Sequence, residues 1–486
     1  DNETSDSSDE DGGSPEKSDG SGHGTTGDEA SSIDEGNDDS ETYTDDMFHK
    51  NEDKLVSTNE WGELPTVYEG LDKSFEDNNV IPQKELQTAR QYQFDRNLKG
   101  MFKNKILRGV DNFKKFEETN KKIVAVMARE FEMKKAANES KRTSESKSGV
   151  LDISKLHNYK FTEDIFLSNT NVADAKSHGM VAIIDFSGSM MSVIGNVVEQ
   201  AIVLAMFCRK VNIPFDIYSF TACAGYAKPI NTIAGIDGLS YVGSKNIKVI
   251  NQLSSNMSNA YFKEVTRLLY LTHNVETSEC MMTSDDWLGS TPLNETLIYM
   301  TDILEEFKRK HNIQKLNFVT ITDGVSNYMR GQTGHSLRGK RGNTYLKIRG
   351  KYVSINLSDD DGRYQGGRES TSGLLEYIKG TGVNTIGYFV VNNADSARRH
   401  ILSKMKGSSK NMDKCNEFKS DKIAVITDIP GYNTYFVIDG RMKATSDNLK
   451  INDSAKKREI LREFKRFSKS KKMNRQLAVK FAIAVS

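Results

Sequence analysis

Residues 180–190 read MVAIIDFSGSM, and no other stretch constrains the fold of this chain as strongly. The first five side chains are apolar, and an aspartate, Asp185, follows them, with hydroxyls at Ser187 and Ser189. A short uncharged run that ends in polar residues predicts a strand buried on both faces, as in a parallel sheet. We therefore predict that these three side chains lie at the carboxyl end of a parallel strand, where open α/β sheets place their ligands.

Apolar residues then recur at three- and four-residue spacing, which predicts a helix packed on one face. The residues in this stripe are Ile194, Val197, Val198, Ala201, Ile202 and Ala205. A buried strand followed by an amphipathic helix is typical of layered α/β proteins. The fold class that we predict is accordingly a doubly wound, mostly parallel α/β sheet.

Two later stretches place oxygen-bearing side chains in similar positions. Residues 316–326 form a second apolar run that ends at Asp323, and Thr291 stands before Pro292. Proline is favoured at the first position of a helix, so Thr291 should lie at a helix start. Hydroxyl and carboxylate oxygens suit a hard cation such as Mg²⁺, which takes few protein ligands and keeps several waters. We predict one discontinuous metal site assembled from these segments.

Five residues, in their order and contexts, resemble the metal-ion-dependent adhesion site (MIDAS) of von Willebrand factor A (vWA) domains: Asp185, Ser187, Ser189, Thr291 and Asp323. The resemblance implies a vWA/Rossmann-like sheet and a bound Mg²⁺, with Mn²⁺ or Ca²⁺ as alternatives. It implies direct ligation by Ser187, Ser189 and Thr291, while Asp185 and Asp323 hold metal-bound waters. An open coordination position would accept an Asp or Glu from an acidic protein ligand.

Other interpretations of the same residues meet chemical objections. A haloacid-dehalogenase-type phosphatase needs an aspartate where Ser187 stands, and an α/β-hydrolase needs Gly-x-Ser-x-Gly. The alternative that stays open is that the hydroxyls only cap the following helix.

Charge is distributed unevenly along the chain. Residues 1–60 hold 20 acidic side chains and three lysines, with almost no large apolar residues, so we predict a disordered acidic N-terminal tail. The remaining residues carry a net charge of +17. A helical region is predicted over 61–148, with an amphipathic helix from about 111 to 137.

The vWA domain is predicted over 149–445, followed by a basic C-terminal helix over 446–486. It should contain an insertion at 324–369, where alternation over 345–357 predicts a hairpin. Because this insertion leaves the Asp323 loop directly, we expect the hairpin on the metal-bearing face.

The insertion contains no Asp or Glu between positions 324 and 357. We predict that it contacts an acidic partner through Arg338, Lys340, Arg341, Lys347, Arg349 and Lys351. A solvated loop is the alternative. Its tyrosines are too few for a base-stacking surface, which disfavours nucleic acid as the ligand.

Residues 148–157 read SGVLDISKLH and stand after an acidic tail and a helical region. This layout is similar to the vWA subunit of aerobic cobaltochelatases, the CobT type, of the kind carried by large tailed bacteriophages. The resemblance implies a non-catalytic, CobT-like adaptor that works with a MoxR-type AAA+ ATPase on a substrate or assembly. Nothing in the sequence specifies cobalt or a tetrapyrrole, and we predict no catalytic residue and no organic cofactor.

Two alternatives remain, a metallopeptidase-like enzyme and an RNA-binding vWA protein. The chain lacks a Gly-x-x-x-x-Gly-Lys-Ser/Thr phosphate loop, so we do not expect it to be the ATPase itself. A zinc peptidase is disfavoured because no histidine after residue 60 has a second histidine within five positions: His157, His178, His273, His311, His335 and His400. The RNA-binding interpretation depends only on the basic net charge.

We expect a cytoplasmic protein, in the host cytoplasm if the chain is phage-encoded. No apolar run approaches the roughly 18 residues of a membrane span, and no basic-then-apolar leader precedes the acidic start. The four cysteines, Cys208, Cys223, Cys280 and Cys415, form no Cys-x-x-Cys, which disfavours a disulfide framework or a zinc ribbon.

Overall fold

The computed structural model describes residues 66–71, 75–142, 144–146, 169–171, 177–222, 241–243, 247–274, 276–324, 326–327, 329–331, 344–355, 366–404 and 410–441. The predicted acidic tail, the segment at 148–157 and the basic helix over 446–486 lie outside these residues. The predicted domain boundaries therefore stay predictions.

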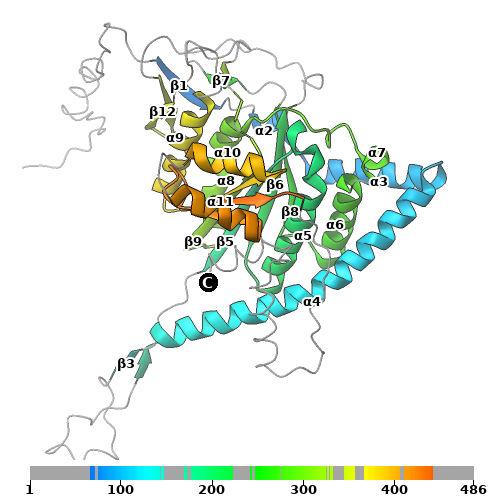
Figure 1. The fold of residues 1–486 in the computed structure, drawn as a ribbon, viewed down its shortest axis with the longest axis horizontal. Coiled ribbons are helices and arrows are strands. Elements are labelled where there is room, and N and C mark those ends of the chain that lie inside the picture. The colour runs from blue at the N-terminus through cyan, green and yellow to red at the C-terminus, as the bar shows by residue number, and fades with distance from the viewer. Residues whose placement is uncertain are drawn as a thin grey trace, which may run out of the picture. The chain divides into compact units, whose positions relative to one another are not determined.

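An eight-stranded sheet lies at the centre of the fold (Figure 1). Its order is β14 (Ile423–Ile426), β15 (Thr434–Asp439), β13 (Asn384–Val391), β9 (Lys315–Thr322), β5 (His178–Asp185), β6 (Phe215–Ala222), β8 (Ile247–Ser254) and β2 (Val80–Ile81). The strands from β15 to β6 are parallel, whereas β8 is antiparallel to β6 and β14 is antiparallel to β15. Numbered in chain order, the six strands from β8 to β15 run 3-2-1-4-5-6, which is the order of a doubly wound sheet. The predicted fold class is confirmed.

Strand β5 is buried on both faces, as its apolar composition predicts. Met180, Ala182 and Ile184 join the hydrophobic cluster on one side of the sheet, and Val181 and Ile183 join the cluster on the other side. This alternation follows from the two-residue period of a strand. Since both faces of the sheet are covered, Asp185 at the end of β5 is buried and has no exposed surface.

Helices cover the two faces of the sheet. The first face carries α5 (Ile194–Lys210), α6 (Asn259–His273) and α4 (Lys103–Arg142), with α3 (Gln83–Lys99) packed against α4 and α6. The second face carries α8 (Leu293–Lys310) and α9 (Gly366–Gly380). Two further helices, α10 (Ala394–Lys404) and α11 (Lys410–Asp421), pack at the β14–β15 end. The helix predicted over 111–137 lies within α4, which is longer at both ends.

A second sheet has the order β10 (Arg330–Gly331), β7 (Tyr241–Gly243), β1 (Thr66–Leu71), β11 (Thr344–Ile348) and β12 (Lys351–Ile355). Strands β11 and β12 form the predicted hairpin. Its two-residue turn has positive φ angles at Arg349 and Gly350, 50° and 75°, as the tight turns that suit hairpins require. The short elements are α2 (Phe75–Asn79), α7 (Ser278–Met281) and the pair β3 (Ser144–Ser146) and β4 (Asn169–Asn171).

Strand β8 is not marked by a regular apolar alternation in the sequence. Its polar residues Gln252 and Ser254 are buried. The Gln252 Nε2 atom donates a hydrogen bond of 2.8 Å to the Ser219 hydroxyl on β6. This tertiary contact satisfies a buried polar side chain that interrupts the apolar alternation of the strand. The antiparallel edge strand β14, which pairs with β15, was not predicted.

None of the helices in the described part of the chain combines the length and apolar character that a bilayer span requires. Three of the cysteines, Cys208, Cys280 and Cys415, are buried free thiols.

Candidate metal site

Asp185 is the last residue of β5 and is completely buried. The Thr322 hydroxyl at the end of β9 donates a hydrogen bond of 2.7 Å to its Oδ2 atom. Its Oδ1 atom is buried and accepts no hydrogen bond within normal geometry from the residues that the structure describes. The Ser187 hydroxyl and backbone also lie close enough to the carboxylate to lower its pKa. One carboxylate oxygen is therefore fixed by the neighbouring strand, and the other has room for a further contact.

Ser187 and Ser189 occupy the turn that joins β5 to α5. Their hydroxyl oxygens lie 3.1 Å apart, and the Ser189 hydroxyl donates a hydrogen bond of 2.7 Å to Oδ1 of Asp323. Asp323 directly follows β9, which pairs with β5 in parallel. The carboxyl ends of two adjacent strands thus bring these hydroxyls and this carboxylate together.

Thr291 reaches the same edge because backbone hydrogen bonds join its loop to β5 and β6. The Gly188 amide donates to the Gly289 carbonyl at 2.7 Å, and the Gly289 amide donates to the Phe186 carbonyl at 3.2 Å. Ser290 and Ala222 exchange two further backbone hydrogen bonds. A methyl group placed on Gly324 would lie 4.0 Å from the Thr291 hydroxyl, so this hydroxyl is next to the Asp323 loop.

All five predicted residues therefore meet at one edge of the sheet. Thr322 is a site residue to which the sequence analysis assigned no role. The signal that could have identified it is its position before Asp323, where the parallel pairing of β9 with β5 places it beside the Asp185 strand end.

The electrostatics of this edge fit a cation. Burial raises the pKa of Asp185 to about 7, against a lowering effect of the Thr322 hydrogen bond, and the nearby Asp323 raises it further. Burial also raises the pKa of Asp323. Two close, desolvated carboxylates are costly when both are charged. Hydroxyl and carboxylate oxygens are also the donor set of a hard divalent cation, so the residues present fit Mg²⁺.

The metal-free protein should lose stability as the pH rises from about 4 to about 7. The pKa of Asp185 is 3.8 in the unfolded reference and about 7 in the folded protein, so in this window the folded state holds a proton that the unfolded chain has released. The contribution of this group is complete below its unfolded pKa and is lost as the pH passes the folded value. Urea denaturation at about pH 5 and about pH 8 would measure the loss, and Asp185→Asn should flatten it. An unchanged pH slope in Asp185→Asn would contradict the assignment.

The turn of the basic hairpin does not lie at the metal-bearing face. At its turn, Arg349 donates hydrogen bonds of 2.9 and 2.7 Å to Oδ1 of Asp302 and also pairs with Glu305, both on α8. Asp302 is nine residues after Leu293, which places it about 14 Å along the helix from the start of α8. The turn therefore lies against the middle of α8 instead of beside the metal edge.

The other residues of the predicted partner-binding set are placed only in part. Lys347 and Lys351 lie on β11 and β12, and the Lys351 side chain is exposed. Arg338, Lys340 and Arg341 lie outside the described residues. A role for this set in binding an acidic partner stays a prediction.

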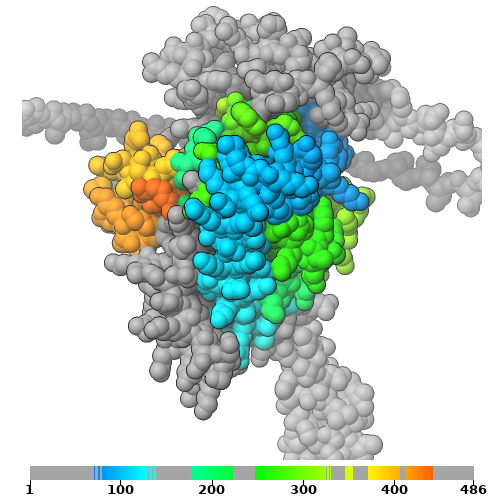
Figure 2. All heavy atoms as spheres, turned by 90° about the vertical axis from the view of Figure 1, so that its right-hand side faces the viewer, coloured from blue at the N-terminus to red at the C-terminus, as the bar shows by residue number. Residues whose placement is uncertain are grey.

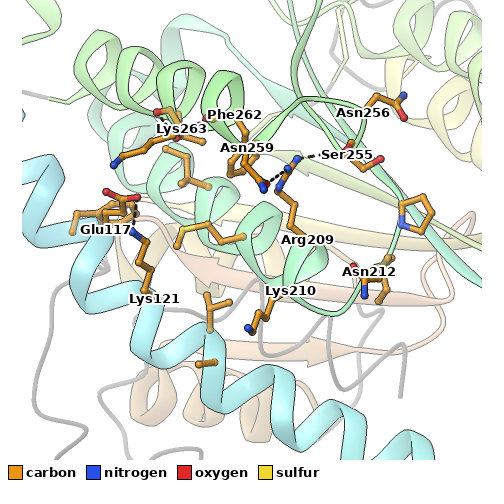
Figure 3. A pocket seen from close by; sticks show the side chains of 18 of the residues that line it. Glu117, Lys121, Arg209, Lys210, Asn212, Ser255, Asn256, Asn259, Phe262 and Lys263 are labelled. Atoms are coloured by element: carbon orange, nitrogen blue, oxygen red, sulfur yellow. Dashed lines mark hydrogen bonds and ion pairs between the residues drawn. The ribbon is translucent and has the colours of Figure 1, made fainter. Parts of the chain in front are cut away.

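A separate groove of about 960 Å³ lies between α4, α5 and α6 (Figure 3). It borders Pro214, just before β6, so it opens at the amino ends of the strands, opposite the candidate metal site. One of the cations that line it, Arg209, donates to the Met257 carbonyl at 3.0 Å and to Oδ1 of Asn259 at 2.6 Å, and it lies over the Phe262 ring. The Arg209 guanidinium is therefore already hydrogen-bonded within the protein.

Comparisons with known proteins concern the fold alone. No family model matches the sequence, and no curated protein matches it. One similar solved structure is the pilus adhesin SpaC from Lactobacillus rhamnosus GG in its open conformation, with a TM-score of 0.29, 14% identity and coverage of 50% of this chain and 30% of the adhesin. The vWF domain of the type V pili tip protein Mfa5 from Porphyromonas gingivalis has a TM-score of 0.25 and 8% identity, with 44% and 82% covered. Proximal thread matrix protein 1 from the mussel byssus has a TM-score of 0.23 and 10% identity, with 52% and 50% covered.

Proposed function

We propose that this chain is a Mg²⁺-dependent vWA adaptor subunit that couples a MoxR-type AAA+ ATPase to a substrate or assembly, as CobT-type cobaltochelatase subunits do. The observation that carries the proposal is the convergence of five oxygen-bearing side chains on one sheet edge: Asp185, Ser187, Ser189, Thr291 and Asp323. Ser187, Ser189 and Thr291 would hold the metal directly, and the two aspartates would hold it through waters. The bound metal would supply an open coordination position for a carboxylate of the protein ligand.

The residues around the ligands have separate tasks in this proposal. Thr322 holds the Asp185 carboxylate in one orientation through Oδ2, which leaves Oδ1 directed to a further group. The contact between Ser189 and Asp323 joins the two strand ends before any metal binds. A preorganised set of this kind favours binding because little order must be imposed afterwards.

Large apolar side chains flank the site and support a protein-binding face. Met191, two residues after Ser189, is 73% exposed, and Trp287, two residues before Gly289, is 61% exposed. Tryptophan is enriched among the residues that dominate binding energy in protein interfaces. This arrangement favours a macromolecular ligand over a small substrate.

The alternatives receive less support. A metallopeptidase requires a zinc site, and within the described residues no three His, Cys, Asp or Glu side chains are grouped so that they could hold a metal. An RNA-binding role is supported by the basic net charge of residues 61–486, but no surface for base stacking was identified among the described residues.

A Mg²⁺-dependent pull-down from the native cell tests the proposal. With Mg²⁺ present the complete chain should recover a MoxR-type ATPase, recognisable by its phosphate-loop sequence in mass spectrometry, and chelation or Asp185→Ala should prevent recovery. Asp395→Ala, an exposed aspartate on α10, is the matched control and should behave as the unaltered chain. Recovery that is equal with and without Mg²⁺ would refute the proposal, and recovery of RNA alone would favour the RNA-binding alternative.

A further inference from the structure

The segment from Glu276 to Thr291 connects α6 to α8 and carries Thr291 to the metal edge. Helices α3 and α4, which precede β5 in sequence, lie against this segment. Figure 2 shows these helices in blue and cyan across one face, beside the green of the α6 region. Several contacts between these helices and the segment are both buried and polar.

The principal contact joins Arg90 of α3 to Asp286, and both side chains have no exposed surface. The guanidinium donates to Oδ1 of Asp286 through NH2 at 2.5 Å and also through Nε at 3.2 Å. Its NH1 donates to Oε1 of Gln252 on β8 at 3.1 Å. Arg90 thus binds the segment and the central sheet with one planar group.

The second oxygen of Asp286 shapes the segment itself. Oδ2 accepts hydrogen bonds from the amide and the hydroxyl of Thr283, at 3.1 and 2.8 Å. Burial alone would raise the pKa of Asp286, but the Arg90 guanidinium and its hydrogen bonds bring that pKa below its ordinary value. The carboxylate is therefore charged, and it closes a turn five residues before Thr291.

Two further contacts hold the same segment. The Asn97 amide on α3 donates a buried hydrogen bond of 2.7 Å to the Cys280 carbonyl. Gly109 on α4 has no room for a side chain, since a Cβ there would lie 2.5 Å from Cγ2 of Thr277 and 2.8 Å from Cδ2 of Leu271. Both helices are thus in close contact with the connection between α6 and α8.

The constraint continues from Asp286 into the candidate metal site. Gly289 exchanges backbone hydrogen bonds with Phe186 and Gly188, inside the Asp185–Ser189 turn, and its amide also contacts the Thr221 hydroxyl. On the other side, the buried His273 ring packs edge-on against Phe186 at a centroid distance of 4.8 Å and lies 3.8 Å from Oδ1 of Asp286. Asp286 is therefore linked to the Asp185–Ser189 turn in two ways, through the His273 ring and along the chain through Gly289.

We propose that Arg90 is a positioning residue which, through Asp286, fixes the loop of Thr291 and thereby sets the Mg²⁺ affinity of a site that it does not touch. This inference rests on the proposed metal site. In this proposal α3 and α4 contribute to metal binding by holding the Thr291 loop, and they do not form a separate domain. The physical reason is geometric: a buried ion pair adds little net stability compared with apolar residues of the same volume, but its planar, bidentate contact specifies one loop position.

Arg90→Lys in the complete chain is the sharpest test. Lysine keeps the buried charge, but its single ammonium cannot bridge Asp286 and Gln252 as the guanidinium does. Mg²⁺ affinity measured by calorimetry should fall about tenfold, the lower end of the effect of changing an outer-shell partner of a metal site. In the metal-free protein, amide exchange at Gly289 and Ser290 should accelerate by about the same factor, while β13 and β15 keep their protection.

Arg96→Lys is the matched control, because Arg96 lies on the exposed side of the same helix. It should change neither quantity. If Arg90→Lys fails to fold, Asn97→Ala removes one contact without leaving a buried charge, and it should show the same two effects at smaller size.

The outcomes separate the two proposals. A folded Arg90→Lys protein with unchanged Mg²⁺ affinity and unchanged exchange would overturn the positioning role. Accelerated exchange in every strand would also overturn it, since it would show only a general loss of stability. Absence of Mg²⁺ binding to the unaltered chain would overturn the metal site, and the local exchange at Gly289 would then decide by itself whether Arg90 positions the loop.

Discussion

Asp185→Ala should reduce Mg²⁺ affinity by on the order of 100-fold. Asp185 is the only one of the five site residues that is completely buried at the end of the central strand, and its Oδ1 atom accepts no hydrogen bond of ordinary geometry from the described residues. Removing it takes away a negative charge and a fixed oxygen from the metal position. Calorimetric titration of the complete chain with MgCl₂ measures the effect.

The variant should still fold, which makes the measurement interpretable. Burial raises the pKa of Asp185 to about 7, so the charged carboxylate disfavours the folded state of the metal-free protein. Circular dichroism and urea denaturation should therefore show a protein at least as stable as the unaltered chain without metal at neutral pH. Asp395→Ala serves again as the control with an exposed aspartate. Unchanged Mg²⁺ affinity in a folded Asp185→Ala protein would remove the metal assignment.

Asp286→Ala should lower the free energy of unfolding by about 3–5 kcal/mol, because it leaves the Arg90 guanidinium buried without a counter-charge. The loss of the two Thr283 hydrogen bonds acts in the same direction. Urea denaturation monitored by circular dichroism gives the change directly.

Asp302→Ala is the control for burial, because it breaks an Arg–Asp pair that is exposed instead of buried. Asp302 also pairs with an arginine, Arg349, but the two side chains are 65% and 44% exposed. An exposed pair contributes about 0–1 kcal/mol, so this variant should be nearly neutral. The double variant Arg90→Met with Asp286→Leu should recover most of the loss, because it removes both buried charges. Equal costs for Asp286→Ala and Asp302→Ala would show that the buried pair has no special energetic role.

Local sequence pattern predicted the central strand, the candidate site residues and the hairpin. Strand β5 and its turn could be recognised because 11 consecutive residues, 180–190, carry the whole signal: an apolar run, then Asp185 and two hydroxyls. The hairpin of β11 and β12 could be recognised because alternation and a glycine at its turn are local features. In each case burial of the strand follows from its own composition.

Strand β8 could not be predicted in this way. Its polar residues break the alternation, and they are tolerated only because distant groups satisfy them, such as Ser219 and Arg90 for Gln252. The position of the basic hairpin is similar, since Arg349 is held by Asp302, 47 residues earlier. Propensity and pattern describe one segment at a time and contain no term for a partner elsewhere in the chain.

By itself, then, the sequence determined which residue types stand at two strand ends and one helix start, and hence that Asp185, Ser187, Ser189, Thr291 and Asp323 are candidates for one site. Only the tertiary structure decided that Thr322 orients Asp185 and that Arg90, 196 residues before Asp286 in sequence, braces the Thr291 loop. The physical reason is that a buried polar group must find its partner in three dimensions, through strand register and helix packing. Nothing in the residues next to Arg90 specifies that its partner is Asp286.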